Sequence, residues 1–282
     1  MSKIAVIFDF DGTLAPDSTS SFLTSLGLDA EWFWREQVQP LLDEGWDEMP
    51  AYLWRMVEWS QKQPPGHRIT RDKLAAWGRQ IQFFPGVKEL FPRIRQEAAA
   101  CDTEIRVEFY LISSGIGEIL RCTAIADQFR DIWSCDFHYN EAGEIIFPRN
   151  VVSFTEKTRF IVQISKGLVG AAARGHNKEV NRKVDEARFA IPFSRMIVVG
   201  DGQTDIPMFA MVGRKNKQGE RGIAIGVSDP REPEKWGRAL QLARDQRVIT
   251  VHRADYSEEG ELLATLLSEV RNLCSNSTSA SM

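Results

Sequence analysis

Two kinds of hydrophobic pattern alternate along most of this chain. Short runs of consecutive apolar and β-branched residues are typical of strands buried on both faces of a sheet, and stretches with apolar residues at helical spacing separate them. The runs that predict strands are 3–10, 105–112, 132–137, 196–199, 222–227 and 248–252. Because strands that alternate with helices form parallel sheets, the pattern predicts an α/β fold with a parallel sheet and helices on both faces.

The helical stretches fall into two groups. Those between the strands cover 87–100, 117–126, 155–166 and 259–273, whereas residues 139–145 combine turn residues and apolar neighbours as in a β-hairpin. The stretch from residue 15 to about residue 80 holds most of the tryptophans in helical patterns, with no convincing strand. We therefore expect a core made of residues 1–14 and 84–274, a helical insert at 15–83, and a flexible C-terminal tail at 275–282.

Composition limits the classes of partner. The chain has 282 residues, of which 43% are hydrophobic and 26% charged, and its net charge is -4. No strongly basic patch predicts a nucleic-acid partner, and no apolar stretch is long enough to predict a membrane span. The apolar run at 4–8 is too short for a signal peptide, and the four cysteines lack paired spacing, so a cytoplasmic location with reduced cysteines is expected. The oligomeric state stays open.

Two aspartates follow the first predicted strand. Asp9 and Asp11 are separated by one residue, and Gly12 comes next. A carboxylate at a strand end can attack phosphorus as a nucleophile, and a second one can protonate the leaving oxygen and later deprotonate water. Gly12 would let the backbone turn sharply beside the substrate. An Asp-x-Asp-Gly segment is also compatible with a plain turn capped by an aspartate, so this motif alone leaves both interpretations open.

A second polar motif follows the strand predicted at 105–112. Ser113, Ser114 and Gly115 lie between that strand and the next predicted helix, where hydroxyls and free backbone N–H groups can bind an anion. Ser113 is the better candidate because it comes first after the strand. Ser114 could act only as the N-cap of the helix, and that role is open to either serine.

A third motif, Asp201 and Asp205 with Gly200 and Gly202, follows the strand at 196–199. Since the carboxyl ends of parallel strands meet at one edge of a sheet, these carboxylates are expected near Asp9. Such crowding of like charges is unfavourable unless a cation lies among them. Oxygen ligands favour a hard divalent cation, and Mg²⁺ fits best.

A lysine is expected to neutralise the phosphoryl group. Lys157 lies at the start of the helix predicted at 155–166 and Lys166 at its end, and the pattern alone does not choose between them. The segment from Gly167 to Arg188 is long and basic, and either a solvated excursion or a partner-binding segment would explain it.

In this order the motifs resemble those of the haloacid dehalogenase (HAD) superfamily of phosphohydrolases. Asp9-Phe10-Asp11-Gly12-Thr13 is similar to the first motif of that superfamily, Ser113 to the second, Lys157 to the third, and Gly200-Asp201-Gly202-x-x-Asp205 to the fourth. The resemblance implies a Rossmann-like core. It also implies that the insert at 15–83 is a small, mobile α-helical cap domain, as in phosphoserine phosphatase-like members. Ser113 and Lys157 would then hold the phosphoryl oxygens, and Lys157 is favoured over Lys166.

The resemblance also implies roles for the four aspartates. Asp9 would be the nucleophile and a metal ligand, and Asp11 the general acid and base, with its backbone carbonyl on the metal. Asp201 would bind Mg²⁺ directly, and Asp205 would bind it or orient its waters. True dehalogenases lack the second aspartate, so the presence of Asp11 favours phosphoryl chemistry.

The sequence therefore predicts a Mg²⁺-dependent phosphatase that hydrolyses a small phosphorylated metabolite through an aspartyl-phosphate. A phosphomutase or phosphotransferase on the same fold is an alternative, because it uses the same pair of aspartates. A non-catalytic phospholigand-binding protein is another, although loss of Asp9 or Asp11 would be expected there. The sequence does not identify the phosphate ester.

Overall fold

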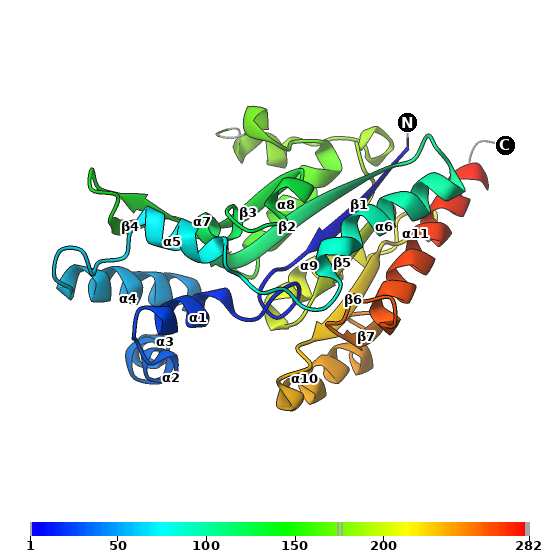
Figure 1. Cartoon of the computed structure of the whole chain (residues 1–282). Helices are drawn as coiled ribbons and strands as arrows, with labels where there is room; N and C mark the ends of the chain where they lie inside the picture. The colour runs from blue at the N-terminus through cyan, green and yellow to red at the C-terminus, as the bar shows by residue number, and fades with distance from the viewer. Residues whose placement is uncertain (1, 174, 176, 280–282) are drawn as a thin grey trace.

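The core of the protein is a seven-stranded sheet (Figure 1). The computed structural model describes residues 2–173, 175 and 177–279. In these residues the strand order is β4-β3-β2-β1-β5-β6-β7, and every neighbouring pair is parallel except the β3–β4 hairpin. The strands are β1 (Lys3–Phe8), β2 (Arg106–Ile116), β3 (Asp131–Tyr139), β4 (Ile145–Asn150), β5 (Met196–Gly200), β6 (Ile223–Ser228) and β7 (Thr250–Arg253). The expected α/β sheet and its hairpin are confirmed.

Strand β1 shows why its sequence is apolar throughout. Side chains alternate between the two faces of a strand, and both faces of this one are covered. Ile4, Val6 and Phe8 belong to one buried cluster, and Ala5 and Ile7 belong to another. The first cluster includes side chains of α6 (Val87–Cys101) and α11 (Glu261–Ser279), and the second those of α8 (Glu156–Lys166) and α9 (Ile206–Val212). A further helix, α10 (Pro233–Arg244), packs on β6 and β7.

The insert after β1 is helical. Its elements are α1 (Ser18–Ser25), α2 (Ala30–Trp32), the π-helix η1 (Phe33–Val38), α3 (Gln39–Asp43), α4 (Glu48–Lys62) and α5 (Arg71–Gly78). They lie together on one side of the sheet, next to the β3–β4 hairpin (Figure 1). Asp17 begins the insert by capping α1, where its Oδ1 accepts the backbone N–H groups of Thr19 and Ser20 at 3.0 and 2.9 Å. The exact limits of the insert as a separate domain stay a prediction.

The helix expected at 117–126 was predicted too long. The α-helix α7 covers only Gly117–Leu120, and a short 3-10 helix, η2, follows at Ala126–Gln128. The backbone N–H groups of Cys122 and Thr123 bond three residues back, at 3.1 and 3.3 Å, instead of four. The Thr123 hydroxyl also donates to the Leu120 carbonyl at 2.8 Å. These bonds tighten the turn and end the helix.

Two other segments add detail to the sequence expectations. Helix α11 continues to Ser279, so residues 275–279 of the expected tail are helical, and residues 280–282 lie outside the described part. The flexibility of that tail stays a prediction. The basic stretch at 167–188 contains the short 3-10 helices η3 (Ala171–Ala173), η4 (Asn177–Asn181) and η5 (Glu186–Arg188), with residues 174 and 176 outside the description. Among the described helices, none is long and apolar enough to cross a bilayer.

Candidate active site

The carboxyl ends of β1 and β5 bring the first and third motifs together. Strand β1 lies between β2 and β5, and the Asp9 N–H extends the ladder by donating to the Val199 carbonyl of β5 at 3.0 Å. Asp201 follows β5 directly, and Asp205 lies in the 3-10 helix η7 (Gln203–Asp205). Asp9, Asp201 and Asp205 each place one carboxylate oxygen within 4.8 Å of the others. The expected meeting of these two motifs is therefore present in the structure.

Lys157 reaches this cluster from the first turn of α8. Its ammonium donates to Asp205 Oδ1 at 2.7 Å, to Asp9 Oδ1 at 3.1 Å and to the Thr204 hydroxyl at 3.4 Å. The Lys157 side chain has no exposed surface, and Asp9 is only 5% exposed. Lys166, at the other end of the helix, donates to the carbonyls of Val180 and Arg182. Lys157 therefore lies beside Asp9, whereas Lys166 contacts the backbone of the basic segment 167–188.

The pKa values of Asp9 and Asp201 are raised, in part by the other carboxylates of the cluster. Burial, opposed by the Lys157 charge and assisted by the Asp205 charge, raises the pKa of Asp9 to about 6. Burial, followed by the charges of Asp205 and Asp9, raises the pKa of Asp201 well above its ordinary value. Burial by itself lowers the pKa of Lys157, but Asp205 and Asp9 outweigh it and the net shift is upward. One ammonium therefore faces three carboxylates.

The donor set fits a hard divalent cation. All three groups offer carboxylate oxygens, the ligand type that Mg²⁺ prefers, and their separation allows them to share one ion. Both oxygens of Asp205 already have donors, Lys157 on one side and the Gly202 N–H at 3.3 Å on the other. Asp9 and Asp201 could therefore ligate an ion directly, and Asp205 contacts Asp9 through Lys157.

Gly12 leaves the space that Asp201 needs. Its φ is +73°, a backbone conformation that residues with a Cβ rarely adopt. A Cβ at this position would lie 2.2 Å from Asp201 Oδ2. The turn after Asp11 therefore requires glycine on two counts, backbone conformation and contact with the third motif.

Asp11 lies outside the three-carboxylate cluster and faces the second motif instead. Its Oδ1 accepts the Ser18 backbone N–H at 2.7 Å, and its Oδ2 lies 2.6 Å from where a Cβ on Gly115 would be. Burial, and then the neighbouring Asp17 charge, raises the pKa of Asp11 to about 8. A carboxyl group with such a pKa retains its proton near neutral pH, which suits a general acid. Its expected backbone contact with the metal stays a prediction.

The second motif differs from the expected loop before a helix. Strand β2 continues through Ser113, Ser114 and Gly115 to Ile116, and α7 spans a single turn whose N-cap, Ile116, makes no side-chain cap. Neither serine is therefore the helix N-cap, and anion binding by this motif stays a prediction. The Ser113 hydroxyl, which is buried, accepts the Gly115 N–H at 2.9 Å. Ser113 is thus fixed close to Asp11 by its own strand.

Sequence reasoning missed the contact that closes the insert over this site. The Tyr52 hydroxyl, on α4, donates to the Ser114 carbonyl at 2.7 Å. A single tyrosine on an apolar helix face carries no sequence signal for such a contact. Ser113 and Lys157 are each at most 1% exposed, whereas Asp11 and Asp201 keep partial exposure.

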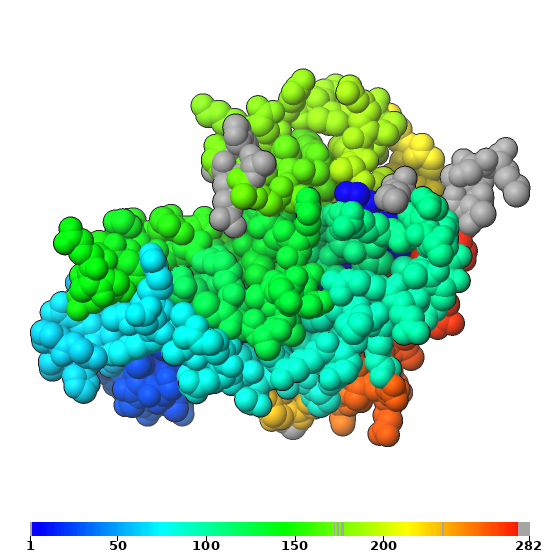
Figure 2. Space-filling view, turned by 45° about the horizontal axis from the view of Figure 1, so that its top comes forward, coloured from blue at the N-terminus to red at the C-terminus, as the bar shows by residue number. Residues whose placement is uncertain are grey.

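The β3–β4 hairpin is bound to the insert as well. Thr70 and Glu144 form an isolated antiparallel bridge, and the Ile145 N–H donates to the Ile69 carbonyl at 3.0 Å. Arg68 also pairs with Glu144 at 3.0 Å. The space-filling view shows the hairpin, in green, lying against the cyan helices of the insert (Figure 2). The hairpin and the insert therefore form one continuous structure over the core.

Comparison with known proteins identifies the fold. No protein-family model matches the sequence. An uncharacterized protein of Borreliella burgdorferi is 24% identical over 95% of this chain and 96% of its own length. A HAD-family hydrolase from Salmonella enterica serovar Typhi superimposes with a TM-score of 0.59 at 15% identity, covering 93% of this chain and 70% of the other. An apo phosphoserine phosphatase superimposes with a TM-score of 0.58 at 13% identity, covering 94% and 98%. The chain thus has the HAD-like fold of the phosphoserine phosphatase type, as its motifs led us to expect.

Proposed function

We propose that this protein is a Mg²⁺-dependent phosphatase that hydrolyses a small phosphomonoester through an aspartyl-phosphate on Asp9. The observation that carries the proposal is the excess of carboxylates, two of them buried and one partly exposed, at one edge of the sheet. Lys157 is ion-paired with Asp9 and Asp205, and Asp201 places a carboxylate oxygen within 4.8 Å of both, an arrangement that is costly without a bound cation. The HAD-like fold, with its phosphatase neighbours, supports the same chemistry.

The proposal gives each site residue a role. Asp9 attacks phosphorus, forming a carboxylate O–P bond while the ester O–P bond breaks, and Asp11 gives its proton to the departing oxygen. Asp11 then takes a proton from water, whose oxygen attacks the aspartyl-phosphate and releases inorganic phosphate. Lys157 is placed to hold a phosphoryl oxygen, and Ser113 is placed to hold another. Mg²⁺, when bound by Asp9 and Asp201, would offset the negative charge of the phosphoryl group.

The closed insert supports a small substrate. Because Asp9, Ser113 and Lys157 have almost no exposed surface, we expect the Tyr52–Ser114 contact to open when a substrate enters. A phosphorylated metabolite can be enclosed by such a movement, whereas a folded phosphoprotein cannot. The cap side chains would then select the ester.

Hydrolysis of p-nitrophenyl phosphate with and without Mg²⁺ tests the proposal. We expect turnover that requires Mg²⁺ and falls by about 10³-fold or more in Asp9→Asn. Asp229→Asn is a matched control, because Asp229 is a buried carboxylate at the end of β6 on the same edge, ion-paired with Arg231 at 2.6 Å. The control variant should stay within a few-fold of the wild type. Turnover by Asp9→Asn close to that of the wild type would refute the nucleophile assignment.

The same assay separates the alternatives. A phosphomutase or phosphotransferase would pass the phosphoryl group to an added sugar or alcohol in preference to water, which product analysis detects. A non-catalytic binder would show no Mg²⁺-dependent turnover of any ester in a panel of phosphorylated metabolites.

A further inference from the structure

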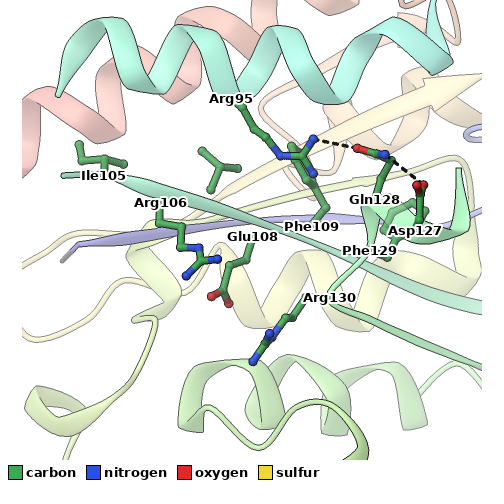
Figure 3. Close-up of a pocket in the computed structure, with 10 residues that line it drawn as sticks. Arg95, Ile105, Arg106, Glu108, Phe109, Asp127, Gln128, Phe129 and Arg130 are labelled. Atoms are coloured by element: carbon green, nitrogen blue, oxygen red, sulfur yellow. Dashed lines mark hydrogen bonds between the residues drawn. The ribbon is translucent and has the colours of Figure 1, made fainter. Parts of the chain in front are cut away.

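A second charged hollow lies at the opposite edge of the sheet. It has a volume of about 560 Å³ and is lined by the first residues of β2, by α6, and by the segment that leads into β3. Its arginines are Arg95, Arg106 and Arg130 (Figure 3). Since β2 runs from Arg106 to Ser113 at about 3.3 Å per residue, the hollow is roughly 20 Å from the catalytic edge.

The hollow exists because β3 begins late. The pairing of β2 with β3 starts only at Tyr110 and Asp131, although β2 begins at Arg106. The Arg106 N–H donates to the Ser2 carbonyl on the β1 side, so the alternation of the strand turns the backbone of Val107 and Phe109 toward the gap. The Phe109 carbonyl accepts the Arg130 N–H at 2.7 Å. The part of β2 before Tyr110 has no β3 partner, and it lies beside the hollow.

The arginines lie on both sides of that edge. Figure 3 shows Arg95 reaching from α6 on the side of Phe109, whereas Arg106 and Arg130 extend on the other side of β2. The Arg95 guanidinium is held over the Phe109 ring at 4.9 Å and donates to Gln128 Oε1 at 2.8 Å. It is therefore an ordered cation rather than a freely moving surface charge.

The carboxylates of the hollow do not cancel these charges. Glu108 lies near Arg130 but is ion-paired with Lys3 at 2.8 Å and accepts the Tyr110 hydroxyl. Asp127 accepts Gln128 Nε2 at 3.0 Å and offsets part of the Arg95 charge. In the part of the chain that the structure describes, Arg106 and Arg130 make no side-chain ion pair within 4.0 Å, so positive charge is left over in the hollow.

We propose that this hollow binds a small polyanion with two separated phosphate or carboxylate groups. Arg95 would hold one group, and Arg106 with Arg130 the other, across the open edge of β2. Two separated anionic groups match arginines on the two sides of the strand, and the volume fits a metabolite. The proposal stands on this geometry and does not depend on the catalytic assignment.

Calorimetric titration with inorganic tripolyphosphate and, separately, with tricarballylate tests the proposal and distinguishes phosphate from carboxylate ligands. The protein is the full chain without divalent metal. We expect saturable binding of at least one probe, weakened about tenfold for each arginine removed in Arg95→Gln and in the double variant Arg106→Gln/Arg130→Gln. Arg238→Gln, on the exposed surface of α10, removes the same charge elsewhere and should change affinity less than twofold. Melting temperatures of the variants check that they fold.

Three outcomes would overturn the proposal. The first is equal weakening in the Arg238 control, which would indicate general charge attraction. The second is binding that survives in the arginine variants but is lost in Lys157→Met, which would place the probe at the catalytic edge. The third is binding of a hexaglutamate peptide through these arginines without binding of either small probe, which would indicate an acidic chain as the ligand. Failure of the phosphatase assay would leave all of these readouts intact.

Discussion

Lys157 offers the sharpest test of the electrostatic reasoning about the site. In Lys157→Met the side chain keeps similar length and apolar character but loses its charge. The ammonium has no exposed surface and contacts Asp205 at 2.7 Å and Asp9 at 3.1 Å, so its removal leaves two buried carboxylates without their cation. Breaking a buried pair from one side costs about 3–5 kcal/mol. We expect the free energy of unfolding to fall by about that amount in the absence of divalent metal.

Urea unfolding followed by tryptophan fluorescence measures this change. Lys166→Met is the matched control, because Lys166 lies on the same helix and donates only to the backbone carbonyls of Val180 and Arg182 in the contacts described. The control should lose about 1 kcal/mol or less per hydrogen bond. Mg²⁺ should stabilise Lys157→Met more than the wild type, since it would supply the missing positive charge; at 100 times its dissociation constant it would add about 2.7 kcal/mol.

The reasoning would be refuted by either of two results. One is a free energy of unfolding for Lys157→Met within about 1 kcal/mol of the wild type. Leaving two buried carboxylates without their cation should cost more than that. The other is an equal loss in Lys166→Met, which would mean that the helix and not the charge cluster is responsible.

Two more predictions test separate features. Gly12→Ala should cost about 1–3 kcal/mol of stability and strongly reduce turnover, because φ is +73° and the new Cβ would lie 2.2 Å from Asp201 Oδ2; near-normal unfolding and activity would contradict this. Glu108 has a lowered pKa, because the Lys3 and Tyr110 contacts outweigh burial, so its contribution is present above its unfolded pKa of about 4.5 and is lost as pH falls through the lower folded value. Glu108→Gln should therefore flatten the decline of stability below pH 4.5 in acid unfolding curves, and an unchanged decline would show that the pair contributes nothing.

The agreement between sequence and structure is closest where a local pattern has one physical solution. An unbroken apolar run such as residues 3–8 must be covered on both faces, and a run of this kind that ends in carboxylates predicts both a central parallel strand and a polar strand end. The same reasoning placed Asp9 and Asp201 side by side, because β1 and β5 are neighbours whose carboxyl ends share one edge.

The second motif shows where local patterns fail. Two serines and a glycine before an apolar stretch predict a loop and a helix cap, but the structure continues β2 to Ile116 and leaves α7 only one turn. Tertiary packing adds to the local hydrogen bonds that end α7. Position 78 of the insert packs so closely on α7 that a Cβ on Gly78 would lie 2.2 Å from the Ile119 carbonyl. The residues next to Ser113 in the sequence do not indicate that Gly78 packs against α7.

The sequence by itself determined the fold class, the helical insert after β1 and the aspartates at the strand ends, because periodicity and strand-end chemistry are properties of neighbouring residues. Only the tertiary structure showed Lys157, which the family resemblance already favoured over Lys166, in contact with Asp9. It alone also revealed the Tyr52–Ser114 hydrogen bond and the arginine-lined hollow beside β2. Each of these depends on where residues far apart in the chain meet. The charge balance at Asp9 belongs to the same group, since one lysine against three carboxylates can be counted only after the chain has folded.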